Sequence, residues 1–408
     1  MKRLVLYLFF VPLLFLNGKV LLGIDVLQKS NFSLLKGKRV GLITNQTGYN
    51  SKLKSTIEIF TSQKEFKLVA LFSPEHGIDG IFSAGQPYNN HIDKKTGLMV
   101  YSLYGNFKKP EKYMLKGIDV LVYDIQDTGI RAYTYITTLG LCMEAAAENN
   151  IEFVVLDRPN PLGGVRVEGN IVEDNFISFV SPYKIPYVYG LTCGELARLI
   201  NDEGMLSSKV KCKLTVVPMR GWQRKMQFND TGLIWLPTST HVPYPFTPYY
   251  QVATGIVGEL QTMSIGIGNT LPFQTFGATW INGDSLATAM NKLGLPGLLF
   301  TPISYIPYYG TFKDSVISGV LIHITDINRV NLMKIQFYLL EIIHKMYPAK
   351  DIFKQAKDSR IKMFDNVLGT DKLRKIFTNR WRTSDISSLL IQDIENFKKL
   401  SKKYYLYE

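Results

Sequence analysis

The chain is poor in cysteine, with only three in 408 residues. Cys142, Cys193 and Cys212 are too few and too scattered to form a disulfide framework or a zinc knuckle. Free cysteine is among the most often buried residue types. We therefore expect three buried free thiols.

Several motifs of common enzyme classes are also missing. The turn after the first predicted strand lacks Gly-x-Gly-x-x-Gly, and no Gly-x-x-x-x-Gly-Lys-[Ser/Thr] or Gly-x-Ser-x-Gly occurs. His76, His91 and His241 are far apart in the chain and show no His-x-x-x-His spacing. These absences argue against dinucleotide, nucleoside triphosphate, serine-hydrolase and zinc chemistry, so we expect neither a cofactor nor a metal ion.

Long apolar runs are confined to the first residues. Lys2 and Arg3 precede the run Leu4–Leu16, which has the length of a signal-peptide core and is too short to span a bilayer. We predict a signal peptide over residues 1–20, a secreted or periplasmic protein, and no stable membrane insertion after cleavage. An uncleaved N-terminal anchor is the alternative.

The formal net charge is +13, with much of the excess in the last sixty residues. Such a charge could attract an anionic polymer. The basic residues are not interleaved with aromatic ones as in a nucleic-acid-binding stripe. We interpret them as a solvated helix surface and expect no nucleic-acid partner. The sequence leaves the oligomeric state open.

Short apolar runs separated by helix-like segments predict an α/β fold. The runs at 39–44, 67–72, 119–123 and 151–156 are typical of parallel strands in a Rossmann-like sheet. We place this first domain at residues 21–205. A second, smaller α/β or α+β domain is expected at 206–408, with a strand at 319–324, a helix at 332–346 and a long loop over 235–279.

Polar clusters follow three of these strands. They contain Glu75 and His76, Asp124 and Asp127, and Asp157, Arg158 and Asn160. In open α/β sheets, ligands bind in the crevice outside the carboxyl ends of the strands. The clusters therefore predict an active site at this edge of the sheet.

Glu75 is the strongest candidate in this group. It follows Pro74 at a strand end and stands beside His76. Apolar neighbours could raise the pKa of such a carboxyl group and suit it to general acid catalysis. A glutamate that only caps the following turn is the alternative.

Arginine and further carboxylates accompany these clusters. We expect one of the aspartates to pair with Arg131, either structurally or to fix a sugar hydroxyl or a carboxylate. Tyr133 follows closely, and Glu168 lies in a turn that could close on the same edge. In the second domain, His241 and nearby tyrosines suit carbohydrate binding, and Glu259 is a possible second carboxylate.

Five ordered motifs together resemble the exo-β-N-acetylmuramidases of the NamZ type, over about Leu22 to Ile281. They are Gly41-Leu-Ile-Thr-Asn45-Gln-Thr-Gly48, Ser73-Pro-Glu-His-Gly77, Tyr123-Asp-Ile-Gln-Asp127-Thr-Gly-Ile-Arg131-Ala-Tyr133-Thr-Tyr135, Leu156-Asp-Arg-Pro-Asn-Pro-Leu-Gly-Gly164 and Val167-Glu-Gly169. The resemblance implies a glycosidase that releases terminal N-acetylmuramic acid from the non-reducing end of peptidoglycan fragments. It also implies an active site in a cleft between a Rossmann-like domain and a smaller C-terminal domain.

The resemblance also assigns residues. It maps the catalytic glutamate to Glu75 and implies a pocket lined by the motif residues Asp127, Arg131, Tyr133, Asp157, Arg158 and Asn160. Asn45 belongs to the first motif. The second catalytic group stays open among Asp127, Glu259 and the substrate's own acetamido group.

One segment departs from the pattern. Similar proteins commonly carry an arginine in a Ser-x-Gly-Arg-Gly-Thr segment, where this chain has Ile267. If that arginine binds the lactyl carboxylate, another cation such as Arg131 has to serve here. A non-catalytic binding protein for cell-wall glycans, and an esterase or amidase acting on wall polymers, are the alternative functions.

Overall fold

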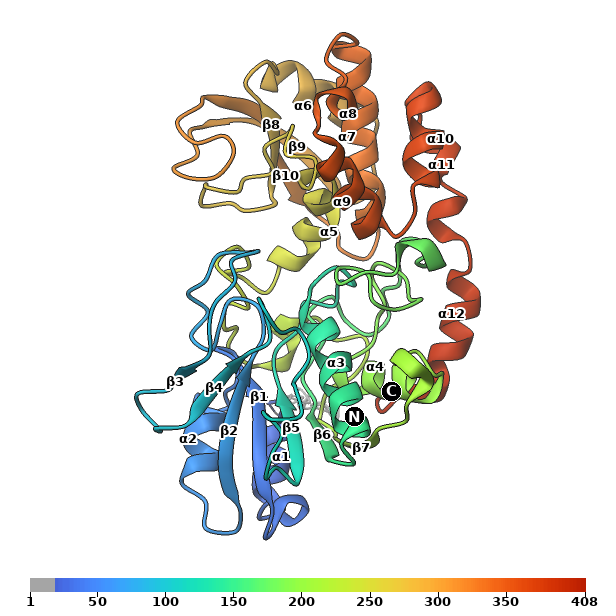
Figure 1. Ribbon diagram of the computed structural model, residues 1–408. Coiled ribbons are helices and arrows are strands. Elements are labelled where there is room, and N and C mark those ends of the chain that lie inside the picture. Colours follow the sequence, from blue (N-terminus) through green and yellow to red (C-terminus); the bar gives the residue numbers. More distant parts are fainter. Residues whose placement is uncertain (1–18) are drawn as a thin grey trace, which may run out of the picture.

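The computed structural model describes residues 19–408, so nearly all of the predicted signal peptide lies outside the described residues. The chain forms two domains, each built around its own sheet (Figure 1). Within the described residues, no helix combines the length and apolar character needed to cross a membrane. The three cysteines are buried and free, as predicted.

The first domain contains a seven-stranded sheet in the order β3-β4-β2-β1-β5-β6-β7. All neighbouring strands pair in parallel except β3 with β4. Without β3, this is the 3-2-1-4-5-6 order of the Rossmann fold, which reverses between β1 and β5. The strands are β1 (Arg39–Thr44), β2 (Lys67–Ser73), β3 (His91–Ile92), β4 (Met99–Ser102), β5 (Val120–Asp124), β6 (Glu152–Leu156) and β7 (Lys213–Val217).

Both faces of the central strands β1, β2, β5 and β6 are covered, which explains why these strands are mostly apolar. In β5, Val120 and Val122 pack into one core cluster, whereas Leu121 and Tyr123 pack into the other. This alternation follows the two-residue period of a strand. Helices α1 (Gly23–Lys29) and α2 (Thr56–Thr61) contribute to the first cluster, and α3 (Tyr135–Glu148) and α4 (Cys193–Asp202) to the second.

The start of α4 is fixed by a capping box. Thr192 Oγ1 accepts a hydrogen bond from the Glu195 backbone N–H at 3.2 Å, and the Glu195 carboxylate accepts one from the Thr192 N–H at 3.1 Å. Reciprocal bonds of this kind satisfy backbone donors that a helix start leaves free.

The second domain has a smaller, antiparallel sheet in the order β8-β10-β9. Its strands are β8 (Thr275–Ala278), β9 (Leu298–Tyr305) and β10 (Ile317–Ile324). Its helices are α5 (Thr247–Gly258), α6 (Gly283–Lys292), α7 (Leu332–Met346), α8 (Ile352–Gln355), α9 (Asp358–Leu368), α10 (Lys372–Arg380) and α11 (Thr383–Ile386). The predicted strand and helix in this region are confirmed. The predicted loop over 235–279 is wrong, because it contains α5 and β8.

The division at residue 205 does not follow the packing. Strand β7 comes after residue 205 but pairs with β6 of the first sheet. Helix α12 (Ile394–Ser401) leads the chain back from the second domain to the first (Figure 1). There the Tyr404 hydroxyl donates to Glu203 and the Arg224 N–H donates to the Glu408 carbonyl. The first domain therefore includes both β7 and the C-terminal residues.

Candidate active site

A cavity of about 470 Å³ is lined by residues of both domains. We call it the interdomain cavity. Its volume lies within the range of small-molecule binding sites. The first domain contributes Glu75, His76, Tyr133 and Thr134, the segment before α5 contributes His241, and the second domain contributes Gln251, Glu259, Ile267 and Arg360, among others.

Glu75 is held at the edge of this cavity by two hydrogen bonds. Its Oε1 accepts from the Gly85 backbone N–H at 2.8 Å, and its Oε2 accepts from Thr134 Oγ1 at 2.6 Å. The residue is only 8% exposed. Two donors thus fix the orientation of the Glu75 carboxyl group at the cavity.

The turn after β2 places Glu75. The Gly77 N–H donates to the Pro74 carbonyl at 3.1 Å, and His76 adopts a left-handed conformation with φ of +73°. Left-handed backbone is costly for a residue with a side chain and occurs frequently at functional sites. His76 Nδ1 lies 2.8 Å from the Phe82 carbonyl, which anchors the ring.

Glu259 supplies a second carboxylate from the end of α5. Burial raises the pKa of this carboxyl group, and the charge of Glu75 raises it further, whereas Arg360 lowers it. The Arg360 Nη1 atom lies 4.0 Å from Glu259 Oε2. The interdomain cavity therefore brings together two carboxylates, one from each domain.

His241 adds a second imidazole to the cavity lining. Its ring stacks on the Tyr309 ring, and its Nε2 contacts the Tyr309 hydroxyl. Burial lowers the pKa of His241, with a smaller contribution from His76. A neutral ring at neutral pH can accept or donate a hydrogen bond to a sugar hydroxyl.

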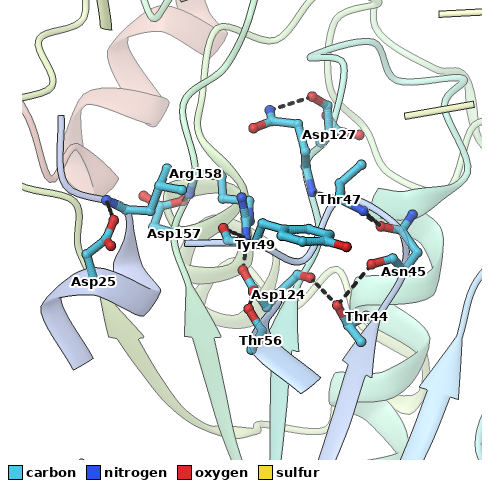
Figure 2. Close-up of polar contacts among 12 residues, drawn as sticks. Asp25, Thr44, Asn45, Thr47, Tyr49, Thr56, Asp124, Asp127, Asp157 and Arg158 are labelled. Carbon is cyan, nitrogen blue, oxygen red and sulfur yellow. Dashed lines mark hydrogen bonds and ion pairs between the residues drawn. The ribbon is translucent and has the colours of Figure 1, made fainter. Parts of the chain in front are cut away.

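The reversal point between β1 and β5 is filled by a hydrogen-bonded group that we call the switch-point network: Thr44, Tyr49, Thr56, Asp124 and Arg158 (Figure 2). Arg158 Nε donates to Asp124 Oδ1 at 2.7 Å, and Thr56 Oγ1 donates to Asp124 Oδ2. Asp124 is fully buried and Arg158 is 5% exposed. Neither residue lines the interdomain cavity.

Asp127 also lies away from the cavity lining. Its Oδ2 accepts from the Gly129 N–H at 2.7 Å and from the Tyr189 hydroxyl. Burial raises the pKa of Asp127 to about 6, against the opposing effect of these donors. The position favours a structural role over the predicted catalytic one.

Three further predicted binding residues are committed to protein contacts. Asn45 Oδ1 accepts from Thr47, and Asn160 bonds the backbone of Leu162 and Leu191. Asp157 accepts hydrogen bonds from Thr192 and Tyr407, among other donors. None of the three lines the interdomain cavity.

The predicted pairing of an aspartate with Arg131 is wrong. The Arg131 guanidinium is fully buried and donates to the backbone carbonyls of Asn170, Ile185, Val367 and Leu368. It thus joins the first domain to α9 and does not itself line the cavity. Glu168 has a similar role, because its Oε2 accepts from the Met333 N–H of α7 at 3.1 Å.

Of the predicted site residues, the structure brings together Glu75, His76, Tyr133, His241 and Glu259 in the cavity lining. Sequence reasoning missed Gly85 and Thr134, which hold Glu75, and Arg360. No pattern in the sequence marks Arg360, which is one of many basic residues in the C-terminal helices. Among residues 19–408, no group of three or more His, Cys, Asp or Glu side chains is arranged to hold a metal ion.

Comparisons with known proteins give family matches over both parts of the chain. Two family models match, one described as the N-terminal domain of the exo-β-N-acetylmuramidase NamZ, at residues 40–245, and one as its C-terminal domain, at residues 249–407. The peptidoglycan β-N-acetylmuramidase NamZ of Bacillus subtilis (strain 168) is 41% identical over 389 residues, which cover 95% of this chain and 92% of that protein.

Two crystal structures of DUF1343 family proteins from Bacteroides fragilis NCTC 9343 are also similar. The first has a TM-score of 0.91 and 50% identity, and the second has a TM-score of 0.75 and 28% identity. Each comparison covers 96% of this chain and 99% of the other.

Proposed function

Because the chain belongs to the NamZ family of exo-β-N-acetylmuramidases, we propose that it releases terminal N-acetylmuramic acid from the non-reducing end of peptidoglycan fragments. The observation that carries this proposal is the pair of carboxylates, Glu75 and Glu259, that line one cavity from two domains. Glycoside hydrolysis commonly uses two carboxyl groups that flank the scissile bond.

In this reaction Glu75 acts as the general acid. It donates a proton to the glycosidic oxygen as the bond from that oxygen to the anomeric carbon breaks. A water molecule finally supplies the hydroxyl at that carbon, and its remaining proton returns to the carboxyl groups of the site. Glu259 is the candidate for the second group because it lies in the cavity, whereas Asp127 does not. Assistance by the substrate's acetamido group is the alternative to Glu259.

The test measures sugar release from a chromogenic N-acetylmuramide. We expect Glu75→Gln to lower kcat by about 10²- to 10⁴-fold, the usual range for general acid–base catalysis, with an unchanged unfolding midpoint. Glu259→Gln separates the two candidates for the second group: a comparable loss supports Glu259, and a small loss supports substrate assistance. Glu58→Gln, on the exposed surface of α2, is the matched control.

Three outcomes would contradict the proposal. Full activity of the folded Glu75→Gln protein would remove Glu75 from the mechanism. A wild-type protein that binds glycan but never releases the sugar would be a cell-wall glycan-binding protein. Products with an intact sugar chain and a lost acyl group would indicate an esterase or amidase.

We also infer that the protein is exported and acts in the periplasm or outside the cell. Lys2, Arg3 and the apolar run Leu4–Leu16 support this inference, as does a cell-wall substrate. Val20 is fully buried, and its N–H donates to the Thr231 carbonyl at 3.0 Å. We therefore expect cleavage before Val20, one residue earlier than the predicted end of the signal peptide at residue 20. N-terminal sequencing of the exported protein would check this, and a mature chain that begins at Leu21 or later would contradict it.

A further inference from the structure

The charged side chains that line the interdomain cavity are two glutamates and one arginine, although the proposed substrate is an acidic sugar. Glu75 and Glu259 are the carboxylates of the cavity, and Arg360 is the only arginine or lysine among its described lining residues. N-acetylmuramic acid differs from N-acetylglucosamine by a lactyl ether that carries a carboxylate. Glu75 and Glu259 cannot supply a positive charge, so a cation elsewhere in the lining is needed to attract that carboxylate.

Arg360 has donors available for such a group. A guanidinium carries five N–H donors in a fixed fork. In the described part of the chain, the Arg360 side chain makes no hydrogen bond, and its ion pair with Glu259 is long, at 4.0 Å. The side chain is half-buried at the wall of the cavity, near the start of α9.

The fully or nearly buried arginines of the molecule differ in this respect. Arg131 donates to four backbone carbonyls, and Arg158 pairs with Asp124. Arg224 pairs with Glu195 and donates to the carbonyls of Gly164 and Gly190. Their donors are used within the protein, and none of them lines the interdomain cavity.

We propose that Arg360 binds the lactyl carboxylate of the terminal N-acetylmuramic acid, an inference that rests on the proposed function. By this contact Arg360 selects N-acetylmuramic acid over N-acetylglucosamine. The planar fork of arginine matches a carboxylate with two parallel hydrogen bonds. The apolar side chain of Ile267 lines the same cavity and cannot supply this charge. Arg131, expected from sequence to take this role, lies outside the cavity.

The test compares two chromogenic substrates, the N-acetylmuramide and its lactyl methyl ester, which lacks the charge. In the wild type we expect kcat/KM to favour the free acid. Arg360→Met should lower kcat/KM for the acid by about 10- to 100-fold, as expected for the loss of a charge-assisted hydrogen bond, and should leave the ester little changed. Arg360→Lys should restore part of the preference, because it keeps the charge without the fork.

A second measurement does not depend on turnover. Calorimetry gives the affinity of the wild type and of Arg360→Met for free N-acetylmuramic acid and for N-acetylglucosamine. The wild type should prefer the acidic sugar and the variant should not. Arg329→Met, at an exposed arginine of the second domain, is the control. An equal loss for acid and ester would mean that Arg360 acts through Glu259, and would overturn the proposal. A wild type that binds the acidic sugar through Arg360 without hydrolysing any substrate would instead refute only the proposed function.

Discussion

The switch-point network and the interdomain cavity use polar residues from the same edge of the sheet in different ways. In the network, the Asp124 carboxylate accepts hydrogen bonds from Thr56 and Arg158, and both charged side chains are buried. In the cavity, Glu75 is fixed by only two donors and faces a hollow shared with a second domain. A polar residue at a strand end is therefore a candidate for chemistry only if the protein leaves space beside it.

This difference also separates the present protein from dinucleotide-binding Rossmann domains. In those folds the crevice at the reversal of strand order holds the ligand. Here an ion pair and two threonines fill the reversal point (Figure 2). The candidate site lies elsewhere along the sheet edge, between the end of β2 and the second domain.

The largest effect on stability is expected from breaking the network. Arg158→Met leaves Asp124 buried without its cationic partner, so we expect a loss of about 3–5 kcal/mol in the free energy of unfolding. Urea unfolding measures this loss. The kcat of the folded protein should stay close to wild type, because Arg158 does not line the cavity.

Arg39→Met is the matched control for that experiment. Arg39 pairs with Asp119 at 2.8 Å, but the two side chains are 54% and 40% exposed. Exposed pairs contribute about 0–1 kcal/mol, so this variant should be nearly as stable as wild type. Equal losses in the free energy of unfolding for Arg158→Met and Arg39→Met would contradict the expected difference between buried and exposed ion pairs.

A smaller effect is expected at Asp127, whose pKa is raised to about 6 from 3.8. Between these values the folded state holds a proton that the unfolded state has released. Stability should therefore fall as the pH rises from about 4 to 6, by up to ~3 kcal/mol. Burial also raises the pKa of Asp157 to about 6, so Asp127→Asn should remove only Asp127's share of this slope, which urea unfolding across pH 4–7 would measure.

Asp127→Asn can also be compared with Glu75→Gln in activity. We expect Asp127→Asn to keep far more activity than Glu75→Gln, because Asp127 contacts Gly129 and Tyr189 instead of the cavity. A loss as large as that of Glu75→Gln would assign Asp127 to catalysis and contradict the structural role.

Sequence patterns predicted the first sheet well, because strands buried on both faces are continuous apolar runs. They also predicted α7, whose bounds match the expected helix. Helix α5 was missed because Thr, Gly, Val and Ile are poor helix formers and its sides are mostly buried, which leaves no polar stripe.

Only part of the candidate site could be predicted from the sequence, and the reason is different. Motif spacing placed Glu75 and Asp124 at one sheet edge, but it could not show which of them faces open space. That distinction depends on the second domain, which closes the cavity from residues far along the chain. Arg131 illustrates the limit, since its partners are carbonyl groups, including those of Val367 and Leu368, which have no sequence signature.

The return of the chain's last residues has a consequence for dissection of the molecule. The Tyr407 hydroxyl donates to Asp157, directly beyond β6, and the Glu408 carbonyl accepts from Arg224. A fragment that stops after the first sheet would lack these partners, and its buried aspartate would lose a donor. Any single cut between the two sheets would therefore separate the first domain from the residues at the far end of the chain that complete its hydrogen bonding.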